Sequence, residues 1–83
     1  MDVGDKVKQA KEGVARGLVD SQIKGRISQR ELARSVGSMP AEEFARGVDG
    51  LVEADVLGPP QYDLKRREVE YSINDKLLRE EYL

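Results

Sequence analysis

The sequence predicts one small α+β domain, mostly helical, in which three helices are followed by a β-hairpin and a short final helix. Apolar residues recur at helical spacing up to about residue 54 and then alternate with polar residues at strand spacing. The 83 residues leave room for one core and not for two. A hydrophobic content of 39% is enough to build that core. We therefore expect residues 1–83 to form a single domain.

The first helix is expected over about residues 3–23. Gly13 and Gly17 weaken it by about 1 kcal/mol each relative to alanine, so tertiary packing must support it. Gly25 is expected to end it in a left-handed conformation. The apolar residues lie three or four positions apart and form one stripe: Val3, Val7, Ala10, Val14 and Leu18.

The second helix is expected over residues 29–36. Ser28 is its predicted N-cap, because Glu31 follows three residues later and completes a capping box. Ile27, just before the cap, is expected to form a single β bridge. Gly37 is expected to end the helix. Its buried face is predicted to consist of Leu32, Ala33 and Val36.

The third helix is expected to begin near Pro40 and to run to about residue 54. Proline is favoured in the first turn of a helix, and acids such as Glu42 and Glu43 suit its positive end. Asp55 is expected to lie in the turn that ends it. The predicted buried stripe contains Phe44, Val48, Leu51 and Val52.

Two strands and a last helix are expected after residue 55. Residues 56–57 form a predicted short strand, and alternation over 68–73 predicts a second one. The roughly ten residues between them, PPQYDLKRRE, are expected to be too long for a tight hairpin. Asn74 or Asp75 is expected to cap a helix whose inward residues are Leu77, Leu78 and Tyr82.

This order of helices, turn, strands and basic loop is that of a winged helix-turn-helix domain, with a three-helix core and a β-hairpin wing. The expected core contains one apolar face from each helix and strand: Val7, Val14, Leu18, Leu32, Val36, Phe44, Val48, Leu51, Val56, Val69, Tyr71 and Ile73.

Two stretches resemble winged-helix regulators of the MarR-like and ArsR-like type. ISQRELARSVGSMPAEEFARGVDGLVEADVLG, residues 27–58, resembles the capped helix, turn, recognition helix and exit into the wing; Ala33 and Gly37 match the small residue and the turn glycine. RREVEYSINDKLLREE, residues 66–81, is similar to the returning wing strand and the helix after it. The resemblance implies a small transcriptional or replication-associated regulator that binds duplex DNA as a dimer.

Seven residues, six of them cations, form the candidate DNA-binding set. Residues 1–40 have a net charge of +3 and residues 41–83 have a net charge of −5, so the cations are unevenly distributed along a chain that is slightly acidic overall. The wing of such a domain commonly lies beside the phosphates or the minor groove of DNA, both of which attract cationic side chains. The alternative interpretation of each candidate residue is that it is an ordinary solvated surface residue. The candidates are Lys65, Arg66 and Arg67 in the wing, Arg30 and Arg34 on the second helix, and Ser38 and Arg46 at the third.

The third helix departs from a usual recognition helix because it is acidic. Glu42, Glu43, Asp49 and Glu53 accompany Arg46 alone. This charge supports a competing hypothesis, in which the domain is a protein–protein adaptor that docks a basic partner through Glu42, Glu43 and Asp49.

The aromatic residues are few, and two tyrosines are candidates for stacking. Tyr71 alternates with apolar residues in the last strand and is expected in the core. Tyr62, beside the wing prolines, is freer to stack on bases or on a partner.

Composition argues against an enzyme. The chain has no Cys and no His, which excludes thiolate and imidazole metal sites and nucleophiles activated by histidine. No glycine-rich nucleotide-binding loop occurs. We expect no catalytic residue, cofactor or metal. Apolar stretches are too short to span a bilayer, and the first residues lack a secretory signal, so a cytoplasmic, intracellular protein with no membrane partner is expected.

Overall fold

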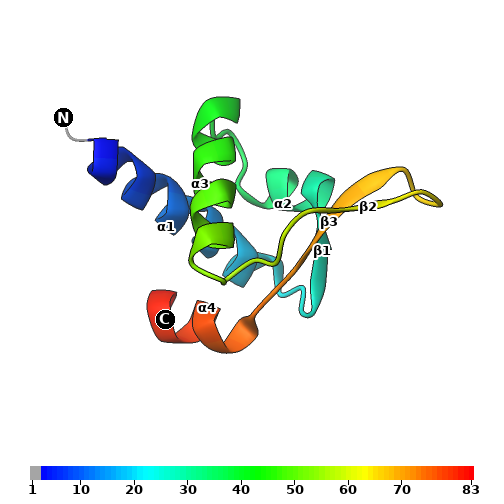
Figure 1. Cartoon of the computed structure of the whole chain (residues 1–83). Coiled ribbons are helices and arrows are strands. Elements are labelled where there is room, and N and C mark those ends of the chain that lie inside the picture. The colour runs from blue at the N-terminus through cyan, green and yellow to red at the C-terminus, as the bar shows by residue number, and fades with distance from the viewer. Residues whose placement is uncertain (1–2) are drawn as a thin grey trace.

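The structure is a computed structural model that describes residues 3–83 (Figure 1). It is α+β and mostly helical, as predicted. Within the described residues, four helices and a three-stranded antiparallel sheet form an arrangement compatible with a winged helix. In chain order the elements are α1 (Val3–Ser21), β1 (Arg26–Ser28), α2 (Gln29–Ser35), α3 (Ala41–Glu53), β2 (Gln61–Asp63), β3 (Glu68–Ser72) and α4 (Asp75–Tyr82).

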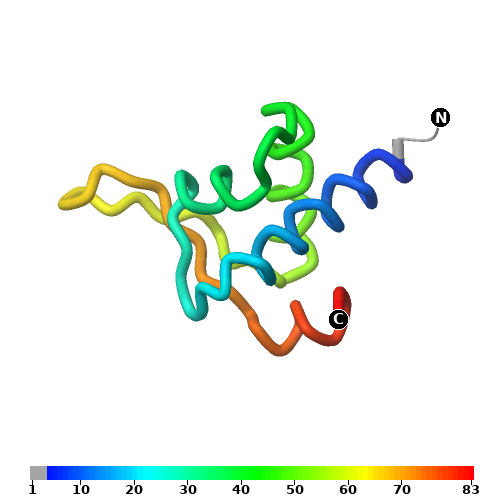
Figure 2. Tube along the Cα trace, turned by 180° about the vertical axis from the view of Figure 1, so that it is seen from behind, coloured from blue at the N-terminus to red at the C-terminus, as the bar shows by residue number. Residues whose placement is uncertain are grey.

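The sheet has the strand order β1-β3-β2, so the last strand lies between the other two. Ile27 of β1 pairs with Tyr71 of β3, and further along β3 Val69 pairs with Tyr62 of β2. Because side chains alternate across a strand, these four residues share the face that turns toward the helices. The β2–β3 hairpin extends away from the helices, and α4 lies at the other end of the molecule (Figures 1 and 2).

The hairpin differs from the prediction. Residues 56–57 were expected to form a strand, but only Leu57 pairs, through an isolated bridge to Ile73. The first strand of the hairpin is instead Gln61–Asp63, inside the segment predicted as a long loop. The prolines at 59 and 60 have no N–H to donate, so strand pairing resumes only after them. The remaining loop is four residues long, 64–67, and the prediction that this connection is too long for a tight hairpin was wrong.

The chain around β1 also differs from the prediction. Ile27 belongs to a three-residue strand rather than to a single bridge. α1 ends at Ser21 instead of residue 23, because Gln22 adopts a left-handed φ of 59°. The Ser21 hydroxyl donates to the Leu18 carbonyl at 2.7 Å and accepts the Ile23 N–H at 3.2 Å at this end. Gly25 has the expected left-handed φ of 85°, but it lies in the turn into β1 rather than at the helix end.

The local signals for α2 and α3 are mostly confirmed. The Ser28 hydroxyl accepts the Glu31 N–H at 3.1 Å, as an N-cap does. Asp55 has a left-handed φ of 63° in the turn after α3, where it was expected. Ala33 was predicted to be buried and is exposed. α2 is only seven residues long, so Leu32 alone fills its place in the core.

The core joins α1, α3, the sheet and α4. Val7 was predicted to belong to it, but it is half-buried near the start of α1 and lies outside the cluster. Val36, Phe44 and Val69 are half-buried and pack against the cluster rather than within it. Asn74 caps α4 by accepting the Leu77 N–H at 3.2 Å, and this helix covers the lower end of the core. The buried cluster is Val14, Ala15, Leu18, Ile27, Leu32, Val48, Leu51, Val56, Leu57, Tyr71, Ile73 and Leu78.

α1 and α3 cross with their backbones in direct contact. A Cβ placed on Gly47 would lie 2.5 Å from the Ala10 carbonyl oxygen and 2.5 Å from a Val14 methyl group. Gly50, one turn later, would meet only the Lys11 side chain, at 2.6 Å. The two glycines therefore differ in what would have to move: backbone at the first, a flexible side chain at the second.

Gly47→Ala should lower the free energy of unfolding by about 1–3 kcal/mol, because overpacking against a carbonyl outweighs the gain in helix propensity. Gly50→Ala is the matched control in the same helix. It should stay within about 1 kcal/mol of the wild type, since the Lys11 side chain can swing aside. Urea unfolding followed by circular dichroism measures both. Equal stabilities for the two variants would contradict the backbone contact.

Candidate nucleic-acid interface

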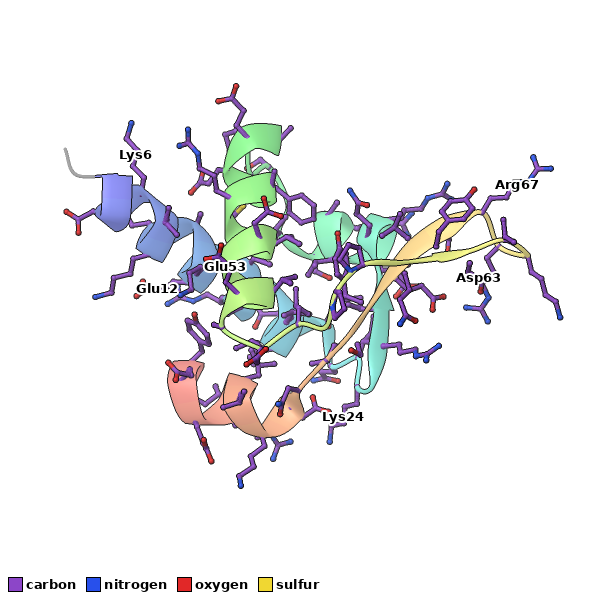
Figure 3. The ribbon with its side chains drawn as sticks, in the orientation of Figure 1. Lys6, Glu12, Lys24, Glu53, Asp63 and Arg67 are labelled. Atoms are coloured by element: carbon purple, nitrogen blue, oxygen red, sulfur yellow. The ribbon has the colours of Figure 1, made fainter. Side chains whose placement is uncertain are left out.

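The tip of the hairpin presents the three adjacent cations. Lys65, Arg66 and Arg67 lie in the loop between β2 and β3, and all three are exposed. Figure 3 places Arg67 at the far end of the hairpin, with its side chain directed outward and Asp63 on the other side of the ribbon. The three predicted cations therefore lie at the exposed tip of the hairpin, although the first strand of that hairpin differs from the predicted one.

Asp63 fixes the shape of this tip. One of its carboxylate oxygens accepts the backbone N–H of Lys65 at 2.9 Å and that of Arg66 at 3.3 Å. Such a side-chain cap holds a turn that its backbone alone would leave loose. Arg67 then adopts a left-handed φ of 54°, which closes the loop onto β3. The tip is a defined turn and not a slack connection.

Glu70 lies on the outer face of the sheet between two arginines. Arg66 Nη1 is 3.6 Å from Glu70 Oε1, and Arg26 Nη1 is 4.0 Å from Glu70 Oε2. The glutamate side chain is 16% exposed, while the two arginine side chains are 72% and 69% exposed. Ion pairs this open to water contribute about 0–1 kcal/mol each. Arg66 is therefore free, at little cost, to exchange Glu70 for an anion of a ligand.

α2 adds a second pair of exposed cations. Arg30 and Arg34 lie two positions before and after the buried Leu32, so both point away from the core. They are four residues apart and share one face of the helix. α2 contacts β3 and follows directly from β1, which places it beside the base of the hairpin (Figure 1).

The residues predicted at the third helix lie apart from the hairpin tip. Ser38 is exposed in the turn before α3, and Arg46 is exposed on α3. Arg46 shares a shallow cavity of about 270 Å³ with Lys6 of α1 and with Glu42 and Glu43. The structure thus brings Arg46 toward the start of α1 rather than toward the wing cations.

The exposed row of α3 is acidic. Glu42, Asp49 and Glu53 are all exposed and recur at positions that share one helix face, whereas Glu43 is half-buried. Burial and, secondly, the negative charge of Asp49 raise the pKa of Tyr71 above its ordinary value of 10.0. Asp49 is therefore close enough to the end of β3 for its charge to act on this core tyrosine.

Two apolar side chains of the hairpin are exposed. Tyr62, which the sequence marked as free, is 59% exposed, and Tyr71 is buried as expected. Leu64 is 81% exposed at the tip and was missed by the sequence analysis. The signal that could have found it is its position: an apolar residue in a polar turn, directly before three cations.

Comparisons with family models, with curated proteins and with solved structures found no match to this chain. No helix in the part of the chain that the structure describes is both long enough and apolar enough to cross a membrane. The same residues contain no cluster of acids arranged to hold a metal ion. The position, exposure and charge of the side chains described above are what support a function.

Asp63→Ala should loosen the tip without unfolding the domain, because two backbone N–H groups lose their acceptor. Amide exchange of Lys65 and Arg66 should become several-fold faster, while core amides stay protected. Asp63→Asn keeps an acceptor oxygen and removes the charge, so it should retain slow exchange at both positions. Hydrogen exchange followed by NMR measures this. Fast exchange in the asparagine variant would show that the carboxylate charge, and not the acceptor, holds the turn.

Proposed function

We propose that this chain is a winged helix-turn-helix domain that binds duplex DNA, as a small transcriptional or replication-associated regulator. The observation that carries the proposal is the tip of the hairpin, where Lys65, Arg66 and Arg67 are adjacent, exposed and held on a defined turn. Cations that meet phosphates release counterions, which supplies affinity regardless of sequence. The proposed activity is binding, with no catalytic residue and no cofactor.

The exposed cations of α2 support the same mode. In domains of this type the helix before the recognition helix crosses the phosphate backbone, and the exposure of Arg30 and Arg34 on α2 supports such a contact. Lys65, Arg66 and Arg67 would contact phosphates or the minor groove. Ser38 and Arg46 would anchor the start of α3. A homodimer would bring two such surfaces to the half-sites of a palindrome and raise affinity.

The proposal assigns positioning on the DNA backbone to these residues rather than base reading. α3 offers an outward row of acids, which phosphates repel. The hairpin and α2 supply the attraction, so they set how the domain approaches the duplex.

Arg66→Ala with Arg67→Ala should reduce the slope of log K against log salt concentration by about 2, because each phosphate contact contributes about 0.9. Fluorescence anisotropy with a labelled duplex at several salt concentrations measures the slope. Lys76→Ala with Arg79→Ala is the matched control, since it removes the same charge from exposed positions of α4. The control should leave the slope unchanged. An unchanged slope in the Arg66→Ala, Arg67→Ala variant would contradict the proposed phosphate contacts of the hairpin tip.

The acidic row of α3 favours a second candidate function, a winged-helix adaptor that docks a basic protein. Glu42 and Asp49 are exposed in this row, as that function needs, while Glu43 is half-buried toward α1. An opposite charge on a partner would be steered to this face. The negative charge of these two acids would oppose DNA binding at α3 and would favour the binding of a basic protein there.

Glu42→Gln with Asp49→Asn separates the two functions. If α3 lies near the duplex, removing two like charges should tighten DNA binding by roughly three- to tenfold at low salt. If α3 docks a basic partner, binding of a fluorescent oligolysine peptide should weaken by a similar factor while DNA binding stays as it was. Both are measured by anisotropy. Absence of DNA binding by the wild type at low salt, with retained peptide binding, would favour the adaptor.

A further inference from the structure

Leu64 has the highest exposure of the large apolar side chains that the structure describes, at 81%, and nothing in the fold requires it to be apolar. Single exposed leucines are common, but this one occupies the tip of a projecting hairpin and is followed by three cations. Tyr62, 59% exposed, lies two residues earlier and lines the same shallow cavity as Leu64. The far end of the hairpin therefore combines an apolar side chain with positive charge.

The tip projects beyond the part of the hairpin that packs against the helices (Figure 1). The last residue of β3 that packs against the core is the half-buried Val69, and Arg67 lies two residues beyond it, which corresponds to roughly 7 Å of extended chain. The base is held by pairing with β1, and the turn is held by the Asp63 carboxylate. Because the base and the turn are both held, the hairpin presents Leu64 to a partner with little further loss of chain entropy on binding.

The dimensions of the minor groove restrict what can enter it. The undistorted groove is about 6 Å across, which is narrower than a two-stranded ribbon with its side chains, so a side chain at the turn enters it with the least deformation of the duplex. Leucine is one of the residues that proteins insert between base steps to unstack and kink DNA. Lys65 and Arg67, which are exposed in the same turn, would meet the phosphates that border the groove.

We infer that Leu64 is a wedge that enters the minor groove at the tip of the wing, unstacks a base step and bends the duplex. This inference rests on the proposed DNA binding and adds a mechanism to it. Pyrimidine–purine steps such as TA unstack most readily, so the wedge gives a preference for sites with such a step at the contact.

The test uses the full chain and a duplex that carries a donor and an acceptor dye at its ends, with 2-aminopurine at a central TA step. Wild-type protein should raise the energy transfer, by bending, and the 2-aminopurine fluorescence, by unstacking. Leu64→Ala should lose both signals while anisotropy still reports binding, weaker by no more than about tenfold. Leu64→Met, which keeps a long apolar side chain, should retain both.

The matched control is Leu83→Ala, which removes an equally exposed leucine, 77% exposed, at the C-terminus. It should behave as the wild type does. Binding without bending or unstacking by the wild type, or equal signals from Leu64→Ala, would overturn the wedge and leave the proposed DNA binding intact. No binding to any duplex would overturn both. Leucine-dependent binding to vesicles of phosphatidylserine, without DNA binding, would assign the tip to a membrane surface instead.

Discussion

The contact of α1 with α3 at Gly47 is the constraint on which the rest of the structure depends. With no Cβ at this position, the backbone of α3 lies against the Ala10 carbonyl, and the two helices bury Val14, Val48 and Leu51 between them. Any larger residue would push the helices apart and open the core. The direction of α3, and with it the side that its acids face, follows from this crossing.

The base of the hairpin is fixed by a short ladder of backbone hydrogen bonds below the sheet. Ile73 donates to the Gly25 carbonyl at 2.7 Å, Asn74 to Val56 at 2.8 Å, and Gly58 to Ser72 at 2.8 Å. The turn before β1 and the segment after α3 thus both bond to the chain at the end of β3. The base of the hairpin is thereby held against the core, so side chains at its tip can be exposed without weakening the fold.

Sequence alone predicted what local rules control. The Ser28 cap, the Asp55 turn, the stripe of α3 and the Ala10, Val14 and Leu18 part of the α1 stripe follow from short-range chemistry and helical period. The Val3 side chain lies outside the described residues. The strand Gln61–Asp63 was missed because it lies at the edge of the sheet and buries neither face, so it has no alternating pattern. The cations of the hairpin tip were singled out from charge, whereas Leu64 was not, because its exposure depends on a turn that the Asp63 side chain closes.

Charge is divided between two surfaces of one small domain. The hairpin tip and α2 are basic, while the outward row of α3 is acidic, and the overall charge is only −2. In the field of a duplex such a molecule experiences a torque as well as an attraction, because its cations are drawn in while its acids are repelled. The attraction is greatest when the hairpin tip and α2 lie closer to the duplex than the acids of α3 do. Charge of both signs on one small domain therefore favours some orientations over others before any specific contact forms.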